Sequence, residues 1–196
     1  MAKAVVDSQW DVGGHSTVLA DIITKRNVKK FAEIGVFRAH SAKYILYKCH
    51  NIIDEYWGID KYDTRWNGVT YTHPKLDEHR WHEMYIRSCR FTPFYPQFKI
   101  MRMSSEEAAQ LFPKRFFPDG YFDFVYIDAD HTYDMVKNDI QLWLPIVKKG
   151  GLIGGHDYGF PDEICRYGGV QKAVDEMFEA DRIVVYKKQG VWLVEV

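Results

Sequence analysis

The sequence has few cysteines and no long hydrophobic run, and each shortage disfavours a class of protein. Its three cysteines, Cys49, Cys89 and Cys165, are odd in number and form no C-x-x-C pair. A disulfide framework and a cysteine zinc site are therefore disfavoured, and reduced thiols in the cytoplasm fit best. No stretch approaches the roughly 20 apolar residues of a membrane span, so we expect a soluble protein.

An excess of positive charge is also missing. The 26 Lys and Arg residues are balanced by 27 Asp and Glu residues, which gives a net charge of -1. No general positive field is available to hold nucleic acid or an anionic membrane, so neither is an expected partner. Whether the chain forms a homo-oligomer is left open.

Short apolar segments alternate with amphipathic ones along the 196 residues. Alternation of strands and helices predicts a parallel sheet with helices on both faces. The last two strands, 182–186 and 191–196, are joined by a connection too short for a parallel crossover, so they should form an antiparallel hairpin. We expect one α/β domain over 1–196, Rossmann-like and doubly wound, with a mostly parallel seven-stranded sheet and this C-terminal antiparallel hairpin.

Local signals add detail to this pattern. Ser16 is expected to cap a first helix, and Ser104 with Glu107 forms a capping box before another. In the helix after Tyr133, spacing points Asp139 outward. The segment 61–96 is longer than a crossover needs and is rich in Trp, His, Arg and Tyr, which indicates an insertion or a lid; a solvated helix with an aromatic inner stripe is the simpler interpretation.

Ligands of open α/β sheets bind beyond the carboxyl ends of the strands. The first predicted strand ends at Gly35, but the following residues lack the second and third glycines of a G-x-G-x-x-G turn. The missing glycines argue against NAD and FAD and leave room for a cofactor without phosphate, such as S-adenosylmethionine. Asp60, at the end of the second strand, is suited to accept hydrogen bonds from ribose hydroxyls.

Four segments together resemble the class I S-adenosylmethionine-dependent methyltransferases: FAEIGVFRAHSA, YWGID, FDFVYIDADHTYDMVKNDIQLWLPIVKKGGLIGGHDY and the terminal hairpin. The long central block is similar to small bacterial O-methyltransferases that act on macrolide sugars and, more distantly, to the catechol type. The resemblance implies a small hydroxylated acceptor, such as a sugar hydroxyl. It also implies a set of cofactor-binding residues, namely Glu33, Gly35 and Ser41 around the methionine portion, Asp60 at the ribose, Ser104 or Ser105 at the adenine edge, and Asp128.

A cluster of acids and histidines follows two of the predicted strands. Asp128 and Asp157 are hard oxygen ligands suited to Mg²⁺ or another divalent metal, and His131 titrates near neutrality, as a general base must. The resemblance places metal carboxylates at Asp128 and Asp157 and the base at His131, with Asp128 also part of the catalytic group. His156 stands where metal-dependent relatives tend to carry a carboxylate, so a softer metal, or none, stays open.

Other interpretations of these residues stay open. The two aspartates can cap the turns that follow their strands, and His131 can bind a backbone carbonyl at a helix start. The chain can also be a metal-dependent hydrolase or oxidase on the same scaffold, or a module that binds S-adenosylmethionine without catalysis.

Overall fold

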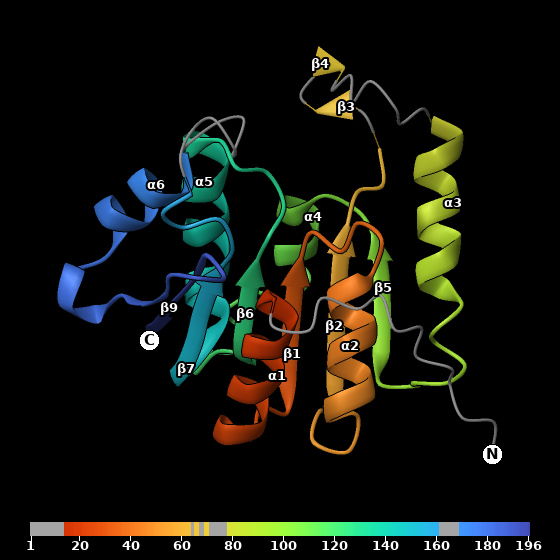
Figure 1. The fold of residues 1–196 in the computed structure, drawn as a ribbon, viewed down its shortest axis with the longest axis horizontal. Helices are drawn as coiled ribbons and strands as arrows, with labels where there is room; N and C mark the ends of the chain where they lie inside the picture. The colour runs from red at the N-terminus through yellow and green to blue at the C-terminus, as the bar shows by residue number, and fades with distance from the viewer. Residues whose placement is uncertain (1–13, 64, 67–68, 71–77, 161–168) are drawn as a thin grey trace.

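A seven-stranded sheet runs through the middle of the molecule (Figure 1). The computed structural model describes residues 14–63, 65–66, 69–70, 78–160 and 169–196. Strand order is β5-β2-β1-β6-β7-β9-β8, and β9 runs antiparallel to both its neighbours while the remaining pairs are parallel. The strands are β1 Lys30–Ile34, β2 Glu55–Asp60, β5 Phe98–Arg102, β6 Phe122–Ile127, β7 Val147–Gly155, β8 Val184–Tyr186 and β9 Val191–Glu195. The predicted sheet and its terminal hairpin are confirmed.

Helices cover both faces of the sheet (Figure 1). On one face α1, α2 and α3 pack into one apolar cluster, and on the other α4, α5 and α6 pack into a second. The helices are α1 His15–Arg26, α2 His40–Cys49, α3 Glu78–Cys89, α4 Ser105–Ala109, α5 Tyr133–Trp143 and α6 Gly169–Met177, with short 3₁₀ turns at Leu144–Ile146 and Ala180–Arg182. In the described part of the chain, no helix is long and apolar enough to cross a membrane.

The position of β6 between two layers of helices explains why its sequence is apolar without alternation. Phe124 and Tyr126 face the cluster of α1 and α2, while Val125 and Ile127 face the cluster of α5 and α6. Side chains of a strand alternate between the two faces, so a sheet covered on both sides needs apolar residues at every position.

Two local expectations were wrong. Gly14, not Ser16, is the N-cap of α1, and Ser16 lies buried in the first turn. Asp139 is not outward but buried, because its carboxylate accepts a hydrogen bond from Ser105 at 2.5 Å, and Ser105 in turn accepts one from the Trp143 indole. The expected capping box of Ser104 and Glu107 is present at α4.

The segment 61–96 holds the two-stranded hairpin β3 Arg65–Trp66 and β4 Val69–Thr70, followed by α3. Helix α3 buries Met84 and Ser88, and Ser88 accepts a hydrogen bond from the Tyr62 hydroxyl at 2.9 Å. Trp81 and Tyr85 also pack against the core from α3. A largely solvated helix with an inner aromatic stripe therefore describes α3, and a lid function stays a prediction. Cys49 and Cys89 are free thiols, while Cys165 lies outside the described residues.

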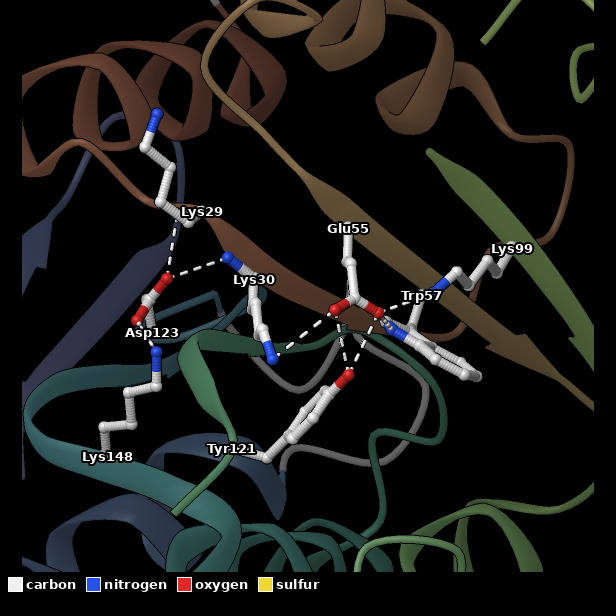
Figure 2. Close-up of polar contacts among 8 residues, drawn as sticks. All are labelled: Lys29, Lys30, Glu55, Trp57, Lys99, Tyr121, Asp123 and Lys148. Atoms are coloured by element: carbon white, nitrogen blue, oxygen red, sulfur yellow. Dashed lines mark hydrogen bonds and ion pairs between the residues drawn. The ribbon is translucent and has the colours of Figure 1, made fainter. Parts of the chain in front are cut away.

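The amino ends of the strands carry a polar network (Figure 2). Asp123 accepts hydrogen bonds from the backbone N–H groups of Lys29 and Lys30, each at 2.8 Å, and from the Lys148 ammonium at 2.6 Å. Glu55 accepts from Lys99 at 2.5 Å, from the Tyr121 hydroxyl at 2.9 and 3.0 Å, and from the Trp57 indole at 3.0 Å. The Lys30 ammonium lies 3.4 Å from Glu55 and so links the two acids. We call these eight residues the amino-end network.

Candidate active site

The opposite edge of the sheet brings the predicted site residues side by side. Past the last ladder pairs, the backbone N–H of Gly35 donates to Ile59 at 2.8 Å, and that of Asp128 donates to Ile34 at 2.7 Å. The N–H of His156 likewise donates to Ile127 at 3.2 Å. These bonds hold the ends of β2, β1, β6 and β7 in one row, as the strand-end rule for parallel sheets requires.

Gly35 occupies a position that no other residue type fits. Its φ is +93°, and a Cβ built there would lie 2.1 Å from the carbonyl oxygen of Asp128. The turn after β1 therefore packs directly on the end of β6, which places Asp128 next to the turn expected to face the cofactor.

Asp60 organises that turn. One carboxylate oxygen accepts from the N–H groups of Val36 at 3.0 Å and Phe37 at 2.8 Å, and the other accepts from Tyr62 at 2.7 Å. Burial raises the pKa of Asp60 above its ordinary range, although the three backbone donors lower it. The same acid thus ties the turn after β1 to the start of the 61–96 segment.

Glu33 is a fully buried acid beneath the turn. Its carboxylate accepts hydrogen bonds from Ser41 on α2 and from the Tyr56 hydroxyl, the latter at 2.5 Å. Burial, together with the nearby charges of Asp128 and Asp60, raises the pKa of Glu33 to about 8, although these two donors lower it. A buried acid in this state gains from any cation placed beside it.

Two aspartates and two histidines converge at the ends of β6 and β7. His131 Nε2 lies 3.1 Å from Asp157 Oδ2 and 3.8 Å from Asp128 Oδ1. His156 Nδ1 lies 3.1 Å from Asp157 Oδ1 and 3.8 Å from the same oxygen of Asp128. One ligand atom each from Asp128, His131 and Asp157 lie within 4.8 Å of one another, so these three can hold a metal ion. We call the four residues the Asp–His cluster.

Both histidines of the cluster are biased toward the protonated form. The contact with Asp128 and the charge of Asp157 raise the pKa of His131, although burial lowers it. For His156, burial lowers the pKa, but the bond to Asp157 and the two carboxylate charges raise it overall. His156 is also bonded to the backbone of Gln189. A backbone contact of this kind orients a ring that ligates a metal through its other nitrogen.

Ser104 and Ser105 lie where β5 leads into α4, one strand beyond Asp60. The Ser104 hydroxyl accepts from the backbone N–H of Glu107 at 3.2 Å, and Ser105 is bonded to Asp139. Burial raises the pKa of Asp139 to about 7, although Ser105 lowers it. The hydroxyl of Ser105 is thus engaged inside the α4–α5 contact, while Ser104 is at the helix start.

Two residues near the cluster escaped the sequence prediction. Tyr126 lies two positions before Asp128, so the period of a strand places both on one face, and its buried hydroxyl has no hydrogen-bond partner among the described residues. His15 at the start of α1 stacks on Tyr126 at 6.4 Å between ring centroids. No local pattern marks His15, because its place depends on how α1 packs on the sheet.

Comparison with known proteins decides the family. A family described as "Methyltransferase domain" matches residues 32–158, which include the turn after β1 and the Asp–His cluster. The chain belongs to this methyltransferase family. No curated protein sequence matches this methyltransferase. Its fold and family make it a class I S-adenosylmethionine-dependent methyltransferase.

Solved structures share the fold of this methyltransferase at low sequence identity. The methyltransferase PaMTH1 of Podospora anserina with bound S-adenosylhomocysteine is 16% identical, with a TM-score of 0.61 over 92% of this chain and 76% of that one. An O-methyltransferase of Bacillus cereus in complex with S-adenosylhomocysteine is 13% identical, with a TM-score of 0.56 over 92% and 80%. The N-methyltransferase NodS of Bradyrhizobium japonicum is 13% identical, with a TM-score of 0.57 over 96% of each chain.

The residues at the strand ends of this methyltransferase fit its cofactor. S-adenosylmethionine carries a sulfonium and an ammonium but no phosphate. The site offers the buried carboxylate of Glu33 and the partly buried carboxylate of Asp60 in place of a glycine-rich cradle for phosphate. The chemistry of the donor set therefore matches a positively charged, phosphate-free ligand.

Proposed function

We propose that this methyltransferase methylates a hydroxyl group of a small molecule, such as a sugar, with the Asp–His cluster as its catalytic centre. The observation that carries the proposal is the convergence of His131 with two carboxylates at the strand ends, at 3.1 and 3.8 Å. A hydroxyl needs help to lose its proton, whereas a neutral amine attacks through its own lone pair. A cluster of one base and several acids therefore suits oxygen better than nitrogen.

The cofactor role is assigned to the residues around the turn after β1. We assign the methionine portion to Glu33, Gly35, Ser41 and Asp128, the ribose to Asp60, and the adenine edge to Ser104, with the bonded Ser105 beside it. The bound cofactor supplies an electrophilic methyl group on a sulfonium. Glu33, with its raised pKa, would become a full carboxylate beside the ammonium group of the bound cofactor.

The cluster has two distinct tasks in this proposal. Asp128, Asp157 and His156 would hold a divalent cation, and such a cation would supply Lewis acidity that lowers the pKa of the acceptor hydroxyl. The contact of His156 with the backbone of Gln189 supports the ligand role, because it orients the ring. His131 accepts the acceptor's proton through Nε2, and Asp128 and Asp157 then stabilise the imidazolium that forms.

The distances also support a second assignment inside the cluster, in which His131 is a ligand instead of the base. A coordinated nitrogen has no lone pair left for a proton, so the two roles exclude each other. Two nitrogens and two carboxylates favour a transition metal over Mg²⁺. Titration with both kinds of metal separates the two assignments.

Calorimetric titration with S-adenosylhomocysteine tests the proposal, repeated with magnesium, with manganese and with a chelator. We expect binding in the micromolar range. Methyl transfer from S-adenosylmethionine to a panel of sugars, phenols and amines should then follow, with loss of turnover in chelator. No binding under any condition overturns the proposal. Metal-dependent turnover without S-adenosylmethionine would favour the hydrolase or oxidase, and binding without product would favour the non-catalytic module.

A further inference from the structure

Three partly exposed rings from separate parts of the chain meet beside the Asp–His cluster. His15 begins α1, His156 directly follows β7, and Phe160 lies in the loop beyond it. The ring centroids of His15 and His156 are 4.5 Å apart, and those of His156 and Phe160 are 5.9 Å apart. His156 thus contacts a ring on each side, and we call these three rings the aromatic wall.

Packing behind the aromatic wall fixes its rings. A Cβ on Gly190 would lie 2.4 Å from the Phe160 ring, so this ring rests directly on the turn between β8 and β9. The backbone of the same loop is tied down where Tyr158 donates to the Gly190 carbonyl at 2.9 Å. On the other side, His15 is nearly parallel to the buried Tyr126, with 13° between their planes. Contacts within the described residues therefore hold the rings of the wall in place, which lowers the entropic cost of binding a ligand there.

The aromatic wall is next to the Asp–His cluster and shares one residue with it. His156 belongs to both, since its Nδ1 lies 3.1 Å from Asp157 while its ring contacts His15 and Phe160. The wall is therefore next to the carboxylates that the proposed function assigns to the acceptor hydroxyl. Rings bind rings and the apolar faces of sugars through stacked or edge contacts, whereas a flexible polar chain gains little from such a surface.

We propose that the aromatic wall binds the ring of the acceptor, and that His15 and Phe160 determine its chemical class. The acceptor is a hydroxylated ring with a flat apolar face, either a phenol or a pyranose sugar, and not an open-chain polyol. This inference rests on the proposed function, because it assigns the substrate class of the same site.

The test compares methyl transfer to catechol, to methyl glucoside and to sorbitol with S-adenosylmethionine as donor. We expect product with at least one ring compound and none with sorbitol. His15→Ala and Phe160→Ala should each raise KM for the ring acceptor by about fivefold to tenfold. Turnover at saturation and affinity for S-adenosylhomocysteine should stay within about twofold, because neither residue is assigned to the chemistry. His15→Phe keeps a ring and should restore the KM.

Matched controls are His50→Ala at the end of α2 and Phe94→Ala in the loop before β5, where the side chains are exposed and far along the chain from the cluster. Both should leave KM unchanged. Unchanged KM in His15→Ala and Phe160→Ala, methylation of sorbitol, or no binding of either ring compound to protein saturated with S-adenosylhomocysteine would each overturn the inference. Failure of the wild-type protein to bind S-adenosylhomocysteine would overturn the proposed function itself. This result can therefore be distinguished from a failure of the aromatic-wall inference alone.

Discussion

The two edges of the sheet use the same residue types in opposite ways. In the amino-end network, Glu55 and Asp123 are each surrounded by lysines, backbone N–H groups or ring donors (Figure 2). Burial raises the pKa of Glu55, but the bonds from Lys99, Tyr121 and Trp57 outweigh it and lower the value to about 2. Burial likewise opposes the bonds to Asp123, whose pKa is lowered overall by Lys148 and the backbone of Lys30.

At the carboxyl ends the acids face one another and the histidines instead. Glu33 has only hydroxyl donors and a pKa of about 8, and Asp60 is also raised. The Tyr126 hydroxyl is buried nearby without a partner among the described residues. Acids satisfied within the chain stabilise the fold, while acids left short of positive charge store binding energy for a cationic ligand. The comparison therefore supports our proposal that the acids at the carboxyl ends serve the cofactor, while those of the amino-end network serve the fold.

The largest expected effect comes from removing the base at the carboxyl-end edge. His131→Ala should lower turnover by a factor on the order of 100 or more with affinity for S-adenosylhomocysteine unchanged. Nearby carboxylates raise the pKa of His131 above its ordinary 6.5, and a base works only when neutral. Wild-type turnover should therefore fall as the pH drops through this raised value, and the variant should lose that limb.

Steady-state rates against pH for wild type, His131→Ala and the exposed α3 control His79→Ala measure this effect. Equal activity of His131→Ala and wild type would remove the base role. A loss of metal binding in His131→Ala would instead assign the residue as a ligand.

A change at the amino-end edge should affect stability alone. Glu55→Gln should lower the free energy of unfolding by about 2 kcal/mol at neutral pH, because the lysines lose their counter-charge. Since the folded pKa of about 2 lies below the ordinary 4.5, the stabilisation is present above 4.5 and is lost as the pH falls toward 2. Denaturation by urea at neutral pH and at about pH 3 should show the difference shrinking.

Turnover of Glu55→Gln, measured below its unfolding transition, should match wild type. A large drop in turnover with unchanged stability would show that Glu55 takes part in function, contrary to the division between the two edges.

The smallest expected effect is a proton exchanged on cofactor binding. The ammonium of S-adenosylhomocysteine near Glu33 should favour the carboxylate, so binding releases up to one proton between pH 4.5 and about 8, and affinity rises with pH in that window. Titration calorimetry in two buffers of different ionisation heat counts the proton. Glu33→Gln should abolish the release and weaken binding by about tenfold, whereas the exposed control Glu83→Gln should retain both. If Glu33→Gln releases as many protons on binding as the wild type does, another group must be the source of the proton.

Much of the fold followed from sequence because its signals are local. The continuous apolar run of β6 predicted a strand buried on both faces, and the short connection before Val191 predicted the reversed strand β9. The strand-end rule also placed Asp128 and Asp157 at neighbouring positions, and the geometry brings them together, although their roles remain proposals.

The missed features depend on packing between distant segments. Asp139 fitted the outward face of a helix, but the Ser105 hydroxyl of α4 supplies a buried partner that no spacing within α5 reveals. His15 reaches the cluster because α1 packs across the sheet, a contact between residues far apart in the sequence. Ser16 was misplaced by two positions, since Gly14 also suits a helix start.

The backbone conformation at Asp157 and the role proposed for its carboxylate both limit which residue types can occupy this position. Its φ of 61° lies in the left-handed region, where glycine, asparagine and aspartate are tolerated better than other residues. A substitution at this position must therefore fit the left-handed backbone and also keep the negative charge. Asparagine fits the backbone but lacks the charge. If Asp157 has the role proposed for it, relatives that have lost activity should still carry glycine, asparagine or aspartate at this position, because the backbone conformation of the turn requires it.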